Sequence, residues 1–148
     1  MDDAAFFDLD RTLLAGASGP MFSTMLKRVG GIPDRSIPGE GLLVRFFDVV
    51  GETVPSMIAT RQMARAAAGW DRSLVQEAGR LAAQGLVHEV PGFAKALIAH
   101  HQEEGRPVVM ATTSPYDLVA PLAEALGIEH VIATRYGELD GRYDGSID

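Results

Sequence analysis

Two aspartates stand one residue apart near the start of the chain, in the stretch DLDRT at residues 8–12. They follow an apolar run at residues 4–7 that predicts a buried strand. If that strand belongs to a parallel sheet, Asp8 lies at its carboxyl end, where such sheets open onto a ligand crevice. Asp8 and Asp10 repel each other at this spacing. Their proximity therefore indicates a bound cation, a phosphoryl group in transfer, or a solvated polar turn.

A second polar cluster, TTSP at residues 112–115, follows the short apolar run VVMA. Ser114 and Asp117 have the S-x-x-D spacing of a capping box, with proline at the first helical position. The amides at such a helix start favour an anion, most simply a phosphate, and the hydroxyl of Thr112 or Thr113 can add a donor. Because the carboxyl ends of neighbouring parallel strands meet at one edge, both clusters are expected to face one crevice.

Carboxylates beside a phosphate site are a ligand set that suits Mg²⁺, which binds one or two carboxylates and keeps water and substrate oxygens in its other positions. The cation also offsets the repulsion between Asp8 and an incoming phosphate. In that setting one carboxylate can attack phosphorus in line and form an aspartyl-phosphate. The other can protonate the leaving oxygen and later deprotonate water.

The elements that must position these clusters follow from the hydrophobic spacing along the chain. Apolar residues repeat at helical intervals between the clusters, so residues 18–88 are predicted to be all-helical. The later part alternates helix and strand, which predicts a parallel sheet with right-handed crossovers. The expected helices are 21–29, 42–50, 55–68, one capped near Asp71, 93–104 and 115–126, and the expected strands are 4–7, 108–111 and 130–134.

The expected fold class is therefore α/β, a Rossmann-like parallel sheet with an inserted all-helical block. Alternating apolar residues around Asp140-Gly141 add a C-terminal β-hairpin. Residues 1–17 and 89–148 are assigned to the α/β core, and residues 18–88 to the helical insertion.

Composition excludes several classes of function. The 148 residues, 47% hydrophobic and 22% charged, are typical of one globular domain. A formal net charge of -7 gives no general attraction to nucleic acid, which is not an expected partner. There is no cysteine, and hence no disulfide or thiolate metal site. No run approaches the roughly 18 apolar residues of a membrane span, and a signal peptide is not indicated, so a cytoplasmic location is expected.

The two clusters and the helical block together resemble the haloacid dehalogenase superfamily of phosphohydrolases. DLDRT is similar to its first motif, D-x-D-x-T after an apolar strand, and VVMATTSP is similar to its second, a strand that ends in Ser or Thr. The helical block resembles the insertion called a C1 cap, as in the phosphoserine phosphatase-like branch. The resemblance covers essentially the whole chain and implies a phosphomonoester hydrolase that acts on a small phosphorylated metabolite.

The resemblance also implies a role for each matching residue. Asp8 would be the nucleophile and Asp10 the general acid and base. Magnesium would be held by the Asp8 side chain and the Asp10 backbone carbonyl. Thr12 would fix the loop beside the phosphate, Thr112 would bind the phosphate, and Thr113 is the second choice for that contact.

The sequence departs from the family pattern after the second motif. The family carries a later lysine and an acidic pair, whereas the only lysines here, Lys27 and Lys95, precede Thr112. The core is therefore expected to be incomplete, the chain to be the N-terminal portion of a longer one, and its own activity to be weak or absent. The strand at 4–7 would then be an open sheet edge through which two copies can associate. Phosphoserine itself is not favoured as substrate, since LLAGASG after the motif offers no acidic residue for its amino group.

Other interpretations of D-x-D remain. Glycosyltransferases use it to hold a metal-nucleotide complex, and receiver domains phosphorylate an aspartate at a strand end, but neither is expected to continue into so long a helical block. The alternative from another class is a non-catalytic, phosphatase-like binding or regulatory module within a larger multidomain protein.

Overall fold

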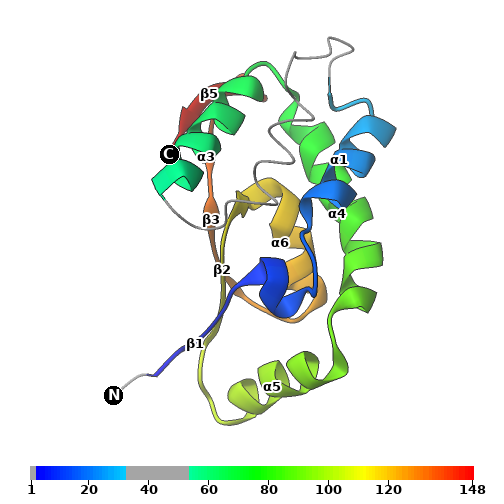
Figure 1. The fold of residues 1–148 in the computed structure, drawn as a ribbon, viewed down its shortest axis with the longest axis vertical. Coiled ribbons are helices and arrows are strands. Elements are labelled where there is room, and N and C mark those ends of the chain that lie inside the picture. Colours follow the sequence, from blue (N-terminus) through cyan, green and yellow to red (C-terminus); the bar gives the residue numbers. More distant parts are fainter. Residues whose placement is uncertain (1–2, 33–53) are drawn as a thin grey trace.

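A three-stranded parallel sheet forms the centre of the molecule. The structure is a computed structural model that describes residues 3–32 and 54–148, so the helix expected at 42–50 lies outside the described residues. The strands are β1 (Ala5–Phe7), β2 (Val108–Pro115) and β3 (His130–Thr134), in the order β1-β2-β3 (Figure 1). Within the described residues β1 has a single neighbour, so its other side is an edge of the sheet. The predicted α/β class is confirmed.

Five helices are described, and each lies within a few residues of the position that the hydrophobic spacing predicts. Asp71 caps one of them as expected, because its carboxylate accepts a hydrogen bond from the Ser73 amide at 2.9 Å. The helices are α1 (Gly19–Arg28), α3 (Val54–Ala66), α4 (Arg72–Glu89), α5 (Gly92–Glu103) and α6 (Tyr116–Ala125).

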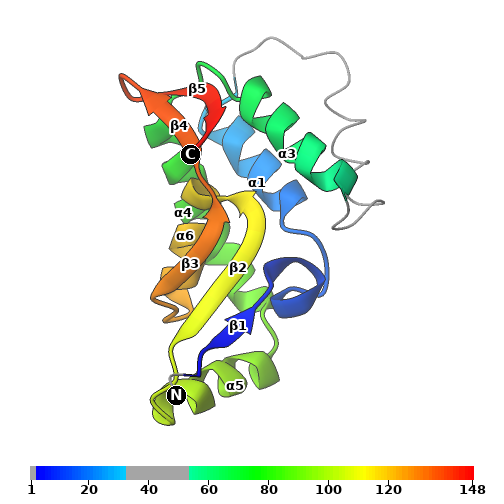
Figure 2. The same ribbon diagram turned by 90° about the vertical axis from the view of Figure 1, so that its left-hand side faces the viewer.

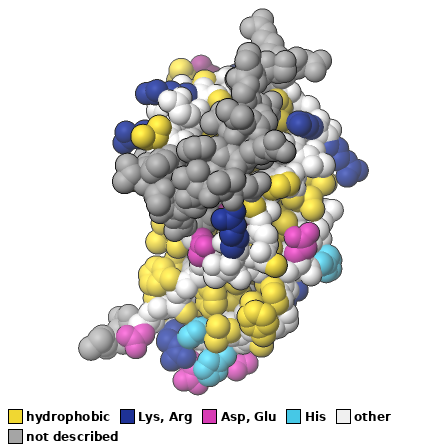
Figure 3. Space-filling view, in the orientation of Figure 1, with side chains coloured by type: hydrophobic (Ala, Val, Ile, Leu, Met, Phe, Trp, Pro, Cys, Tyr) yellow, Lys and Arg dark blue, Asp and Glu magenta, His cyan; other side chains and the backbone are white. Residues whose placement is uncertain are grey.

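Among the described elements, α4, α5 and α6 lie on one side of the sheet, and the strands lie in front of α4 and α6 in Figure 2. Side chains of β1 alternate accordingly, because Ala5 and Phe7 are buried whereas Phe6 on the opposite face is 64% exposed. Ile132 of β3 is also exposed. Figure 3 shows further hydrophobic side chains over the part of the surface where α5 lies, and Phe93 of α5 is exposed.

Helix α4 packs directly against α6, and this contact positions the start of α6. A Cβ atom added at Gly79 would lie 2.6 Å from the Asp117 carbonyl oxygen and 2.9 Å from that of Leu118, so the two helix backbones approach closely there. Leu86 of α4 and Leu122 of α6 are buried in the same core. Helix packing thus requires glycine at position 79, although glycine has a poor helix propensity.

The C-terminal hairpin is confirmed. Strand β4 (Tyr136–Leu139) pairs antiparallel with β5 (Arg142–Ile147). Asp140 and Gly141 between them have φ angles of 52° and 77°, the left-handed conformation of both central residues in a type I′ turn. Strand β5 also packs against α3.

Two local predictions are wrong. Strand β2 does not end at residue 111 but continues to Pro115, which pairs with Thr134 of β3 after a register shift. The capping box at Ser114 does not form. Helix α6 begins at Tyr116, and the carboxylate of Asp117 accepts hydrogen bonds from other elements instead.

Candidate active site

Asp8 emerges from β1 beside the polar segment of β2. Phe7 pairs with Met110, so Asp8 lies level with Ala111 and just before the TTSP segment at 112–115. The chain then forms the wide turn Leu9–Leu13, in which the Leu14 amide donates to the Leu9 carbonyl at 2.9 Å. Turns of this i→i+5 type are frequent at functional sites. The turn brings the side chains of residues 8–12 to the carboxyl end of the strands.

Within this turn, Thr12 contacts the proposed nucleophile. Its hydroxyl donates to Asp8 Oδ2 at 3.1 Å. Arg11 has a φ angle of 59°, an uncommon conformation for a residue other than glycine, and its amide donates to the Gly16 carbonyl at 3.1 Å. This hydrogen bond links the two ends of residues 8–12, the loop that the resemblance assigns Thr12 to fix.

Asp10 is held from two sides. Its Oδ1 accepts a short hydrogen bond of 2.6 Å from the amide of Ser18, which directly precedes α1. Its Oδ2 accepts a long one of 3.4 Å from the Ser114 hydroxyl. The second contact joins residues 104 positions apart and brings the two polar clusters together at one end of the sheet, as the sequence predicts.

The two candidate phosphate ligands differ in their surroundings. Thr112 is half-buried, and its Oγ1 accepts a hydrogen bond of 3.2 Å from the Ser114 amide. Thr113 is exposed, and its carbonyl accepts from the Thr134 hydroxyl at 2.7 Å. The Thr113 backbone is thus fixed by β3 while its side chain faces solvent.

Sequence reasoning missed the two serines that contact Asp10. Ser18 is 1% exposed, and its hydroxyl has no hydrogen-bond partner among the described residues. The signal that could have found it is its place before Gly19-Pro20, since serine followed by proline marks a helix start. No local signal could have paired Ser114 with Asp10, because only the folded sheet brings them together.

Two hollows lie elsewhere on the surface, and neither is lined by Asp8, Asp10 or the two threonines. One of about 670 Å³ runs along α4, α6 and β3, with Gln76, Arg80 and Glu124 in its wall. The other, about 340 Å³, lies between the start of α6 and the hairpin.

The oxygen donors of Asp8 and Asp10 suit Mg²⁺. Both carboxylates are half-buried, and each Asp10 carboxylate oxygen accepts one hydrogen bond. No group of three or more His, Asp or Glu residues that could hold a metal ion occurs within residues 3–32 and 54–148. Two carboxylates suffice for an ion that retains water and substrate oxygens.

In the same described ranges, no helix has the length and apolar character needed to cross a membrane.

A parallel α/β sheet that presents paired aspartates beside a hydroxyl-rich strand end, with helices inserted between the two, is the arrangement expected of the haloacid dehalogenase class. The chain belongs to the haloacid dehalogenase-like hydrolase family, whose profile matches residues 5–148.

The curated relatives include proteins with phosphatase names. A protein of Mycobacterium tuberculosis named as a probable phosphatase is 36% identical over 151 residues, which cover 97% of this chain and 51% of that protein. A Streptomyces azureus protein, named for inhibition of morphological differentiation, is 32% identical over 149 residues that cover 98% of this chain and 53% of its own length. The chain thus spans about half the length of these relatives.

Solved structures share the fold. A Bordetella pertussis protein of unknown function matches with a TM-score of 0.76 at 25% identity, over 100% of this chain and 67% of its own. A phosphoserine phosphatase, solved as a phospho-aspartyl intermediate analogue, matches with a TM-score of 0.55 at 16% identity, over 99% and 63%. The second likeness concerns the fold alone.

Proposed function

We propose that this chain carries the nucleophile and the general acid and base of a phosphomonoester hydrolase that acts through an aspartyl-phosphate. The observation that carries the proposal is the meeting of two clusters distant in sequence, with the Ser114 hydroxyl on Asp10 at the carboxyl end of paired parallel strands. The family supports a hydrolase. The phospho-aspartyl analogue solved for a structural neighbour supports the type of intermediate.

In the proposed reaction, Asp8 attacks the phosphorus atom in line as the bond to the leaving oxygen breaks. Asp10 gives that oxygen its proton and then takes a proton from the water that hydrolyses the aspartyl-phosphate. The Asp8 carboxylate is steadied for this attack by the hydroxyl of Thr12. The products are the free alcohol and inorganic phosphate, and both carboxyl groups return to their starting states.

Magnesium dependence is part of the same proposal. The Asp8 side chain and the Asp10 backbone carbonyl would hold the ion. When bound, Mg²⁺ supplies positive charge that offsets the repulsion between the Asp8 carboxylate and the anionic substrate. The short hydrogen bond from the Ser18 amide fixes the orientation of the Asp10 carboxylate.

We propose Thr113 ahead of Thr112 as the phosphate ligand because its side chain is the more exposed of the two, which reverses the order of preference that the sequence suggests. We expect Thr113→Ala to weaken binding of inorganic phosphate about tenfold, the loss of one hydrogen bond to a charged group. Thr112→Ala is expected to change it less, because Thr112 is half-buried and its hydroxyl oxygen holds the Ser114 amide. Titration of both variants by NMR with magnesium present measures the difference. A larger loss for Thr112→Ala would restore the original preference.

The substrate proposed is a small phosphorylated metabolite, and the location proposed is the cytoplasm. The division into a core of residues 1–17 and 89–148 and a helical cap of residues 18–88 belongs to the same proposal. The later lysine and acidic pair of the family pattern have no counterpart after Thr112. We therefore expect weak activity of these 148 residues by themselves. The function is tested with Asp8→Asn, by measuring formation of the aspartyl-phosphate as well as turnover.

Self-association through the open edge of β1 is proposed as well, with a second copy as the partner. Phe6, which is 64% exposed on this edge strand, would be buried in such a contact. Sedimentation should show concentration-dependent dimers that Phe6→Lys converts to monomers, since lysine on an edge strand opposes strand pairing. The matched control is Phe93→Lys, which removes an exposed phenylalanine from α5 and should leave the dimers intact. Monomers at every concentration would disprove self-association.

A further inference from the structure

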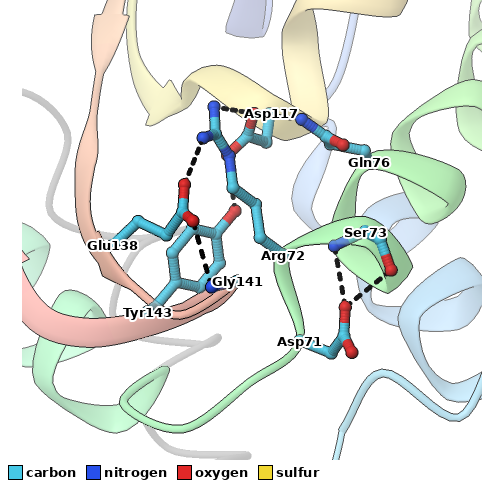
Figure 4. A network of polar contacts seen from close by, with 8 residues as sticks. All are labelled: Asp71, Arg72, Ser73, Gln76, Asp117, Glu138, Gly141 and Tyr143. Atoms are coloured by element: carbon cyan, nitrogen blue, oxygen red, sulfur yellow. Dashed lines mark hydrogen bonds and ion pairs between the residues drawn. The ribbon is translucent and has the colours of Figure 1, made fainter.

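The carboxylate of Asp117, in the first turn of α6, is fully engaged by side chains from two other elements. Arg72 at the start of α4 donates to it from Nε at 3.0 Å and from a second guanidinium nitrogen at 3.3 Å. The Tyr143 hydroxyl of β5 donates at 2.7 Å, and the Gln76 side-chain amide donates at 3.2 Å (Figure 4). The Asp117 side chain is only 10% exposed. The fork of Arg72 suits a carboxylate in a way that lysine does not.

Arg72 also reaches the hairpin. Its remaining guanidinium nitrogen donates to Glu138 Oε2 at 2.6 Å, and the other oxygen of Glu138 accepts from the Gly141 amide at 3.1 Å (Figure 4). The hydrogen bond that Arg72 donates to Asp117 and, with a smaller effect, the one that it donates to Glu138 raise the pKa of the guanidinium above its usual range. Burial, and next the hydrogen bond to Asp117, raise the pKa of Tyr143. Arg72 is therefore charged and Tyr143 neutral near pH 7.

The backbone around Arg72 is fixed by the same hairpin. The Arg72 amide donates to the Gly141 carbonyl at 3.0 Å, and the Gly69 amide donates to the Tyr143 carbonyl at 2.7 Å. The Tyr143 amide donates in turn to the Trp70 carbonyl at 3.0 Å. Segment 69–72 thus pairs with β5 much as an additional short strand would. The backbone and the guanidinium of Arg72 are thus both held by contacts within the protein.

Asp117 closely follows the TTSP segment in the sequence, so the contacts that fix Asp117 also restrain that segment. Tyr116, the first residue of α6, lies beneath the Arg135 guanidinium at 3.6 Å from the ring centroid, a second restraint on the same turn. Asp117 is an acidic residue in the first helical turn, where its negative charge opposes an approaching anion. The Arg72 guanidinium neutralises this charge.

We propose that Arg72 is a positioning residue for the phosphate-binding segment: it fixes the first turn of α6 and cancels the charge of Asp117 near the anion. The inference rests on the proposed function, because it takes residues 112–115 as the phosphate contact. Among the described residues, the guanidinium of Arg72 hydrogen-bonds to Asp117 and Glu138 rather than to Asp8 or the two threonines, so it acts through Asp117.

The test compares Arg72→Met with Asp71→Ala. Asp71→Ala removes the N-cap of the same helix without touching α6, so it controls for a general loss of stability. Two quantities are measured: hydrogen exchange of the amides at 112–118, and the affinity for inorganic phosphate with magnesium present. Relative to the control, Arg72→Met should speed exchange about tenfold and weaken phosphate binding about tenfold. Arg72→Lys should restore part of the affinity, because it keeps the charge but loses the fork.

A double variant separates the two parts of the proposal. Arg72→Met combined with Asp117→Asn removes both charges, so phosphate affinity should recover only in part, by the share that charge contributes, while exchange at 112–118 stays fast. If Arg72→Met alters neither quantity beyond Asp71→Ala, or speeds exchange without weakening phosphate binding, the proposal is overturned. If the unaltered chain binds no phosphate, the proposed function fails, and the exchange rates still decide whether Arg72 holds the segment. Should Arg72→Met not fold, Asp117→Asn alone, which keeps the shape of the side chain but weakens the hold of Arg72, should still speed exchange at 112–118, and unchanged exchange would overturn the proposal.

Discussion

Asp8→Asn is expected to abolish formation of the aspartyl-phosphate and to lower the rate of hydrolysis of an aryl phosphate at least about a thousandfold, or about 4 kcal/mol of transition-state stabilisation. The amide keeps the size of the carboxylate and can still accept from the Thr12 hydroxyl, but it cannot attack phosphorus. The fold should be preserved. The loss can therefore be assigned to the missing nucleophile.

Trapping the intermediate gives a measurement that does not require fast turnover. Beryllium fluoride with magnesium mimics a phosphoryl group on a carboxylate, and fluorine NMR should detect its adduct with the unaltered chain and none with Asp8→Asn. Asp3→Asn, an exposed aspartate before β1, is the matched control and should behave like the unaltered chain. An adduct or undiminished turnover in Asp8→Asn would rule out Asp8 as the nucleophile.

Asp10→Asn should separate the two carboxylates. Asp8 remains able to attack, so the beryllium fluoride adduct should still form. Turnover should fall about 10²–10⁴-fold, the range for loss of a general acid and base. With an aryl phosphate, whose leaving group needs little protonation, the loss should appear mainly in hydrolysis of the intermediate. Equal loss of the adduct in both variants would instead assign a binding role to the pair.

Sequence patterns predicted the parts of the site that depend on neighbouring residues. DLDRT after an apolar run is enough to locate Asp8 at a strand end, and Asp140-Gly141 is enough to locate the hairpin turn, because both signals lie within a few positions. The capping box failed for the complementary reason. Asp117 has the right local spacing to Ser114, but Arg72, which lies 45 positions away, binds its carboxylate more strongly.

The same limit applies to the contacts of Asp10 and to the length of β2. The pairing of Pro115 with Thr134 extends β2 past its apolar residues; the two threonines of TTSP suit a strand, but the proline that follows does not. The hydroxyl of Ser114 reaches Asp10 only because β1 and β2 are neighbours in the sheet. Pairing between distant strands, rather than local propensity, decides these features.

Gly79→Ala is expected to destabilise the protein by about 2–3 kcal/mol, although alanine is the better helix former by about 1 kcal/mol. The added methyl group would lie 2.6 Å from the Asp117 carbonyl oxygen and 3.1 Å from the Leu118 Cα atom. Both are backbone atoms of α6, so no side chain can turn aside and the helices must separate. Since Asp117 follows closely on the TTSP segment, the displacement should also weaken phosphate binding.

Gly85→Ala on the same helix is the matched control. Its added methyl group would meet only the terminal carbon of Met21, at 3.3 Å, and that flexible side chain can move. Gly85→Ala should therefore leave stability unchanged or raise it by up to about 1 kcal/mol. Urea unfolding of both variants measures the difference. Equal stability of the two variants would mean that α4 and α6 do not approach each other as closely as Gly79 indicates. The inference that α4 positions the phosphate-binding segment would then also be wrong.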